Sequence, residues 1–83
     1  MDDLAFDPHA RDEMAHDSVS EDEVYTVVAD ADEIIERPDG RSEYARMMDD
    51  GRWIVAVVDE ESRTVVTIWW DTRRSRRRNR RRR

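Results

Sequence analysis

The sequence predicts a small α+β domain with two helices packed on a four-stranded antiparallel sheet. Two observations lead to this prediction. The N-terminal third of the chain has helix-capping residues followed by apolar residues at helical spacing. Residues 33–70 instead form short runs of β-branched and aromatic side chains, separated by turn residues. A chain of 83 residues has room for one domain, so the helices and the sheet should share one core. The helices are therefore expected to cover one face of the sheet.

The first helix is predicted within residues 6–17, FDPHARDEMAHD. Asp7 suits the N-cap, and Pro8 suits the first helical position because its missing N–H is not needed there. Leu4 and Phe6 precede the helix, and the sequence leaves open whether they form a short strand or a hydrophobic staple.

The second helix is predicted within residues 20–31, SEDEVYTVVADA. Ser20 and Glu23 have the spacing of a capping box, in which each side chain accepts a hydrogen bond from the other residue's backbone N–H. The acidic residues of the first turn are also favoured by the helix dipole. The apolar face repeats at helical spacing and consists of Val24, Val27, Val28 and Ala31.

Four strands are predicted after the helices, within residues 33–37, 41–48, 53–60 and 64–70. The links between them are short: Pro38-Asp39-Gly40, Asp49-Asp50-Gly51 and residues 59–63. Since short links join neighbouring strands, we expect an antiparallel meander. The runs WIVAVV and VVTIWW are apolar at both odd and even positions, which is typical of strands that are central or covered on both faces.

Charge is divided sharply along the chain. Residues 1–71 hold all 21 Asp and Glu and six Arg, a formal charge of −15, whereas residues 73–83 hold nine Arg. Residues 72–83 have no apolar side chain to bury, and their like charges repel. We therefore expect a folded domain at 1–71 and a disordered tail at 72–83.

The tail is the strongest local signal of a partner, because clustered arginines neutralise phosphates and release their counterions. We expect contact with RNA or other nucleic acid, without sequence preference, through Arg73, Arg74, Arg76, Arg77, Arg78, Arg80, Arg81, Arg82 and Arg83. Two alternatives stay open. The tail could fold back on the acidic domain and screen it, or it could be a poorly constrained extension of the reading frame.

The composition argues against several classes of protein. Without Cys, neither a disulfide nor thiolate chemistry is available. The start lacks the apolar stretch of a signal peptide, and the longest apolar run, residues 53–58, is too short to cross a membrane. The acidic residues form charge runs in turns, with neither metal-binding spacing nor a phosphate-binding glycine loop. We expect a cytoplasmic protein without metal, cofactor or membrane contact.

Residues 9–24, HARDEMAHDSVSEDEV, together with EIIE, a glycine turn and the closing VVTIWW, resemble the family called domain of unknown function 4258. This family sits among the RelE/ParE/BrnT-like toxins, and its N-terminal pattern is roughly H-A-x-x-R-M-x-x-R-G-I-S-x-x-x-V. The resemblance implies a RelE-like fold, a toxin of a toxin–antitoxin system, metal-independent cleavage of RNA and a cognate antitoxin as partner. Glu13 and Asp17 stand where the pattern has Arg, and this loss of basic residues opposes RNA cleavage.

Four residues are candidates for catalysis if the resemblance extends to activity. His9 matches the histidine of the pattern and could transfer a proton near neutral pH. Arg46, with Arg41, could stabilise the charge on a phosphorane, and Tyr44 could orient a base or donate a hydrogen bond. Tyr44 and Arg46 share a strand face, so they could bind a phosphate if the helices leave that face open. The structural alternatives are that His9 caps helix contacts or packs against the sheet, and that Arg46 pairs with a carboxylate.

The tryptophans offer a different kind of contact. Strand alternation should bury one of Trp69 and Trp70 and expose the other, while Trp53 is expected in the core. The exposed member precedes the tail and could stack on a base or contact a protein, and the sequence favours the protein. Three functions stay open: a toxin-like RNA-cleaving protein, a non-catalytic nucleic-acid-binding or partner-binding module, and a partner-binding remnant without nucleic-acid contact.

Overall fold

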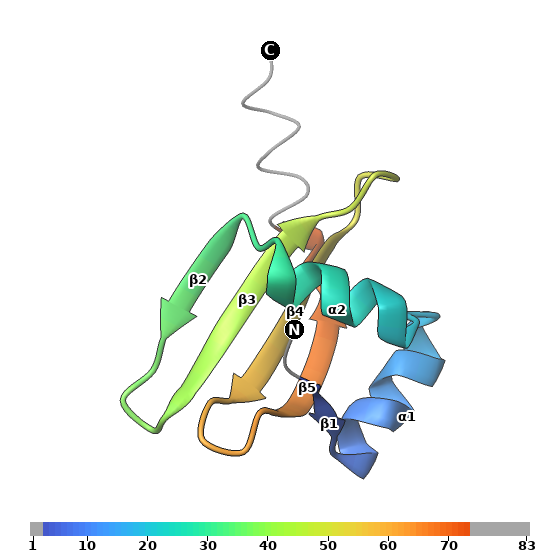
Figure 1. Cartoon of the computed structure of the whole chain (residues 1–83). Helices are drawn as coiled ribbons and strands as arrows, with labels where there is room; N and C mark the ends of the chain where they lie inside the picture. Colours follow the sequence, from blue (N-terminus) through green and yellow to red (C-terminus); the bar gives the residue numbers. More distant parts are fainter. Residues whose placement is uncertain (1–2, 74–83) are drawn as a thin grey trace.

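The computed structural model of the protein describes residues 3–73. In chain order, its elements are β1 (Ala5–Phe6), α1 (Pro8–Asp17), α2 (Glu21–Ala29), β2 (Glu33–Glu36), β3 (Arg41–Met47), β4 (Trp53–Asp59) and β5 (Thr64–Trp70). Helices α1 and α2 lie on the same face of the sheet, as Figure 1 shows. The predicted α+β class is therefore confirmed.

Helix α1 begins and ends at residues that suit its termini. The Asp7 carboxylate accepts a hydrogen bond from the backbone N–H of His9 (N to Oδ1 2.9 Å), and Pro8 occupies the first turn. The helix stops where Ser18 adopts the left-handed conformation with φ 56°. The N-cap prediction for Asp7 is confirmed.

Helix α2 carries the predicted capping box. The Ser20 hydroxyl accepts from the Glu23 backbone N–H (3.1 Å), and Glu23 Oε1 accepts from the Ser20 backbone N–H (3.0 Å). Two residues of the predicted apolar face, Val24 and Val27, are fully buried. The box uses one carboxylate oxygen of Glu23, and the other oxygen lies toward β4.

The sheet has the strand order β1-β5-β4-β3-β2. Strands β2 to β5 are successive antiparallel neighbours, so this part of the sheet is the meander that the short links predict. Gly40 (φ 87°) and Gly51 (φ 90°) adopt the positive φ that these tight links require and that glycine reaches without steric cost.

The prediction of a four-stranded, wholly antiparallel sheet is wrong in one respect. Ala5 and Phe6 form a fifth strand, β1, which runs parallel to β5 and makes the sheet mixed. The backbone N–H of Ala5 donates to the carbonyl of Arg63 (3.0 Å), and that of Asp7 donates to the carbonyl of Val65 (3.0 Å). Two residues are too few to give an alternation pattern, so the sequence could not decide between a strand and a staple.

The main core lies between the helices and the sheet. Each side chain in it is at most 8% exposed, and burying one Val or Ile side chain stabilises a fold by about 1.5–3 kcal/mol. The buried members are Leu4, Ala10, Met14, Val19, Val24, Val27, Ile54, Ala56, Val58, Val65 and Ile68.

The opposite face of the sheet is apolar at its centre. The side chains that gather there are Ala45, Met47, Trp53, Val55 and Trp69. Since the helices cover one face of β4 and these side chains the other, residues 53–58 are all buried. The sequence predicts that WIVAVV is either central or covered on both faces, and the structure shows that β4 is the central strand of the sheet.

Strand β2 forms the edge of the sheet beside β3 and is exposed along its whole length. Ile34 is 56% exposed and Ile35 is 48% exposed, and the two side chains lie on opposite faces of the strand. An open edge presents backbone groups that another strand can pair with.

Candidate functional site

The structure does not bring the four catalytic candidates together. His9 is exposed in the first turn of α1, which packs on β5. Arg46 lies on β3, and β4 separates β3 from β5. Since neighbouring strands are about 4.8 Å apart, β3 and β5 lie roughly 10 Å apart, and α1 is at the β5 end of the sheet.

Tyr44 and Arg46 share a face of β3, as the alternation predicts, but it is the face that the helices cover. Their partners across the ladder, Ala56 and Ile54, both belong to the main core. Arg41 is an odd number of residues away on the same strand, so its side chain lies on the other face. The open-face phosphate site therefore does not form from these residues.

Arg46 pairs with a carboxylate, which is the structural alternative that the sequence left open. Its Nη2 lies 3.5 Å from Oδ2 of Asp30, beyond the end of α2, and its Nη1 donates to the Met47 carbonyl (3.1 Å). The side chain is 22% exposed. The guanidinium is thus held between α2 and the end of β3.

Tyr44 belongs to a polar cluster with Glu60 and Arg63. The Tyr44 hydroxyl donates to Glu60, which also accepts from Arg63. Burial, with the hydrogen bond to Glu60, raises the pKa of Tyr44 above its ordinary value of 10.0. Burial opposes ionisation of Glu60, but hydrogen bonds from Tyr44, Ser42 and Arg63 outweigh it and lower the pKa of Glu60. At neutral pH neither group is ready to exchange a proton, so the cluster is structural.

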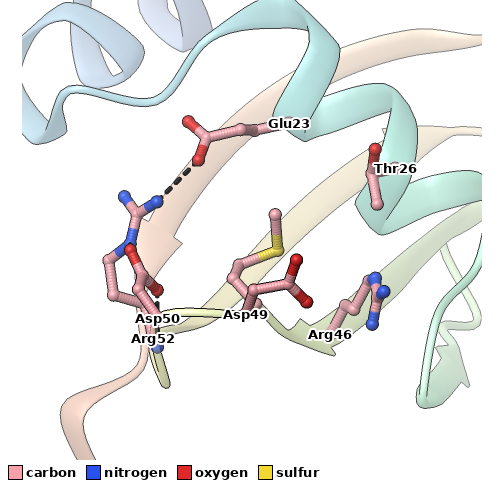
Figure 2. A pocket seen from close by; sticks show the side chains of 7 residues that line it. Glu23, Thr26, Arg46, Asp49, Asp50 and Arg52 are labelled. Carbon is pink, nitrogen blue, oxygen red and sulfur yellow. Dashed lines mark hydrogen bonds and ion pairs between the residues drawn. The ribbon is translucent and has the colours of Figure 1, made fainter.

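A cavity of about 340 Å³ opens between α2 and the β3–β4 turn, as Figure 2 shows. Its volume is at the lower end of the range of small-molecule sites. Three carboxylates and two guanidinium groups contribute to its wall, so its charge does not favour a phosphate. The lining residues are Glu23, Thr26, Arg46, Met48, Asp49, Asp50 and Arg52.

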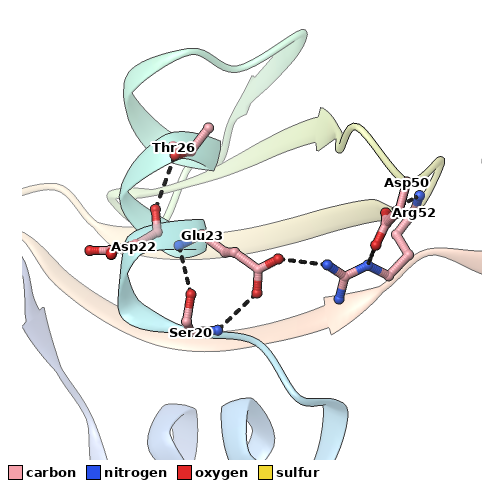
Figure 3. A network of polar contacts seen from close by, with 6 residues as sticks. All are labelled: Ser20, Asp22, Glu23, Thr26, Asp50 and Arg52. Carbon is pink, nitrogen blue, oxygen red and sulfur yellow. Dashed lines mark hydrogen bonds and ion pairs between the residues drawn. The ribbon is translucent and has the colours of Figure 1, made fainter.

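Arg52 connects α2 to the β3–β4 turn, and Figure 3 shows its contacts. Its Nη2 donates to Oε2 of Glu23 (2.6 Å), and its Nε donates to Oδ2 of Asp50 (2.6 Å). The hydrogen bond from the Ser20 backbone lowers the pKa of Glu23, and Arg52 adds to this effect against the opposing effect of burial. The backbone N–H of Arg52 is the main cause that lowers the pKa of Asp50.

Sequence reasoning missed the contact between Glu23 and Arg52. The two residues are 29 positions apart, and the sequence assigns Glu23 only to the capping box. No local pattern could have found the pair, because it depends on where α2 lies over the sheet.

The arginines of the folded domain are largely neutralised by nearby carboxylates. Arg41 lies opposite Asp59 across the β3–β4 ladder. The ion pairs found among residues 3–73 are Arg11–Glu21, Arg37–Glu43, Arg46–Asp30, Arg52–Glu23, Arg52–Asp50 and Arg63–Glu60. The domain therefore offers little cationic surface to a polyanion.

The end of β5 is where the tail begins. Trp70 is 42% exposed, whereas Trp69 packs on the helix-free face and Trp53 is buried, so the predicted division of the tryptophans is confirmed. The backbone N–H of Asp71 donates to the Trp53 carbonyl (2.8 Å), which fixes the chain after β5 to the start of β4. Arg73 is exposed. The other predicted tail contacts, Arg74, Arg76, Arg77, Arg78, Arg80, Arg81, Arg82 and Arg83, lie outside the described residues.

Within residues 3–73, no group of three or more His, Asp and Glu residues is placed to hold a metal ion. No helix in this part of the chain is long and apolar enough to span a bilayer.

A family model for a domain of unknown function (DUF4258) matches residues 6–70. The chain belongs to the DUF4258 family. The matched DUF4258 region begins at Phe6, the second residue of β1, ends with the last residue of β5 and stops before the arginine tail. No curated protein and no solved structure is significantly similar to the chain.

Proposed function

We propose that this DUF4258 protein is a non-catalytic module that holds nucleic acid through its arginine tail. The division of its arginines carries the proposal. Five of the six arginines in residues 1–71 form ion pairs with carboxylates, whereas residues 72–83 contain nine arginines and no acidic residue. Clustered arginines without acidic neighbours bind phosphates by releasing counterions.

The acidic domain limits where the nucleic acid can lie. A formal charge of −15 on residues 1–71 repels phosphates, and the cavity between α2 and the β3–β4 turn is also rich in carboxylates. A bound strand should therefore contact the tail and the surface where the tail begins. RNA is the ligand we expect first, in the cytoplasm where it is abundant.

Salt titration of RNA binding tests this proposal in the full-length protein. A variant with all nine tail arginines replaced by Gln should lose binding, whereas the matched variant with Lys at the same positions should keep most of it. For a single strand, the slope of log K against log salt should approach roughly −6 if all nine contact phosphates. Binding that survives the Gln replacements would place the contacts in the domain and refute the proposal.

The domain also has a surface suited to a protein partner. Strand β2 leaves its outer edge open, with Ile34 and Ile35 exposed on its two faces, so a partner strand could pair with it. The resemblance to RelE/ParE/BrnT-like toxins makes a cognate antitoxin the partner to test. Co-expression with the product of a small adjacent reading frame should give a complex that Ile35→Lys weakens. A complex that forms equally well with this variant would exclude the β2 edge.

A toxin-like RNA-cleaving activity is the second candidate. The match of His9 to the family pattern and the helix–helix–sheet order support it, together with the resemblance of the sequence to RelE/ParE/BrnT-like toxins. The separation of His9 from Arg46 and the pairing of Arg46 with Asp30 oppose it. Incubation of mixed cellular RNA with the protein and its His9→Ala and Arg46→Ala variants decides between the two. Cleavage that both variants lose would replace the binding proposal with this one.

A further inference from the structure

We propose that Trp70 is a stacking platform for one unpaired base, so that the preferred ligand of the tail is single-stranded nucleic acid. The inference rests on the proposed function, because the tail must supply the phosphate contacts. Aromatic rings bind single strands without sequence preference, since every base has a π-face to stack on them.

Trp70 is the exposed large aromatic residue of the described domain. It is 42% exposed, whereas Trp53 is 1% exposed and Trp69 is partly buried against the helix-free face. Burying an aromatic ring is a main source of stability in so small a domain. An indole left exposed at the end of β5 is therefore available for a ligand.

Arg52 holds the ring in place. Its guanidinium carbon lies 5.1 Å from the centroid of the Trp70 ring, in a cation–π contact. Glu23 and Asp50 fix the same guanidinium through hydrogen bonds of 2.6 Å each. The ring is thus supported by α2 and the β3–β4 turn, and a base that stacks on it does not have to order it first.

The surroundings of Trp70 do not suit the apolar core of a protein interface. Its neighbours Arg52, Glu23 and Asp50 are charged, whereas protein interfaces have cores that are depleted of charge. The exposed isoleucines of β2 are at the opposite side of the sheet, because β4 and β3 separate β2 from β5. Trp70 therefore does not form one apolar patch with Ile34 and Ile35.

The position of Trp70 relative to the tail completes the argument. The hydrogen bond from Asp71 to the Trp53 carbonyl anchors the chain directly after the ring. Arg73 is three residues further on, within about 11 Å along even a fully extended chain. A strand whose phosphates contact the first tail arginines can therefore reach the ring. A base in a duplex is already stacked on both faces, so only an unpaired base can use the site.

Competition between a short oligo(dT) strand and a mixed-sequence duplex of equal length tests the inference, with binding measured by fluorescence anisotropy. Trp70→Leu should lower affinity for the single strand roughly five- to 150-fold. The matched Trp70→Phe variant keeps a ring and should lose much less. Duplex affinity and the salt slope should be the same in all three proteins. Quenching of tryptophan emission by oligo(dT) should also disappear in Trp70→Phe.

The inference would be overturned if Trp70→Leu and Trp70→Phe lost single-strand affinity equally. It would also be overturned if Trp70→Leu lost affinity equally for the single strand and for the duplex. Unchanged single-strand affinity in Trp70→Leu would overturn it as well, and this includes the case in which that variant instead loses self-association or a protein partner. Far-ultraviolet circular dichroism of each variant separates these results from loss of the fold. Failure of the proposed function looks different, because replacing the tail arginines with Gln would then leave all binding intact.

Discussion

Replacing Glu23 should destabilise the domain through two separate contacts. One carboxylate oxygen accepts a hydrogen bond from the Ser20 backbone N–H in the capping box. The other accepts a hydrogen bond from Nη2 of Arg52, the residue directly before β4. Glu23→Ala removes both contacts. Glu23→Gln keeps an oxygen for the cap but removes the charge, so comparison of the two variants separates the cap from the ion pair.

The expected magnitudes follow from the partial burial of the pair. The side chain of Glu23 is 29% exposed and that of Arg52 is 21% exposed, so the contact is screened less than a surface ion pair. A hydrogen bond between charged groups contributes about 1.5–3 kcal/mol, but Arg52 keeps its contact with Asp50, so we use the lower value. With about 0.5–1 kcal/mol for the cap, Glu23→Ala should cost about 2 kcal/mol, and Glu23→Gln, which loses only the ion pair, about 1.5 kcal/mol. In a domain of this size, 1 kcal/mol lowers Tm by about 4–8 °C.

The pH dependence supplies an independent check. Because the fold lowers the pKa of Glu23 below its ordinary value of 4.5, this residue contributes stability above pH 4.5 that is lost as pH falls through its lower pKa in the folded state. Thermal unfolding followed by circular dichroism should show a smaller loss of Tm on acidification for Glu23→Gln than for the native protein. Ser20→Ala is the control, because it breaks the box and leaves the pair with Arg52 intact. This reasoning would be refuted if Glu23→Gln had the same Tm as the native protein and the same loss of Tm on acidification.

Three further substitutions test other parts of the fold. Ile54→Ala leaves a cavity in the main core and should cost about 2–5 kcal/mol in urea unfolding, and a smaller loss would mean that the core relaxes to fill the space. Gly40→Ala meets no atom within 4 Å, so its cost of about 1–2 kcal/mol should come only from the φ of 87°, and an unchanged Tm would contradict that geometry. Tyr44→Phe removes the hydrogen bond to Glu60 and should cost about 1–2 kcal/mol at neutral pH. Because the pKa of Tyr44 is raised above 10.0, the stability it contributes is lost as pH rises past that value, and the Phe variant should lack this alkaline step in a Tm profile.

Several parts of the candidate site were readable from the sequence. Strand alternation places Tyr44 and Arg46 on one face and divides Trp69 from Trp70, but Arg41, which is grouped with Arg46 as a catalytic candidate, lies on the other face of β3. Alternation predicts whether two residues lie on the same face of the sheet, but it does not predict which face the helices cover. Both faces of β4 and β5 are apolar, so neither face is marked as the one under the helices. For that reason the sequence could place Tyr44 and Arg46 together but could not tell that the helices lie over them.

The local features of this protein follow from its amino-acid sequence: the two helix caps, the glycine turns, the meander strands and the division of charge between domain and tail. Each of these depends on residues a few positions apart, or on composition alone. Three features needed the folded structure: β1 joins the sheet beside β5, Arg52 contacts Glu23, and Trp70 is the exposed tryptophan. These features join segments that are distant in sequence, and they arise when the helices and the sheet bury their apolar faces against each other.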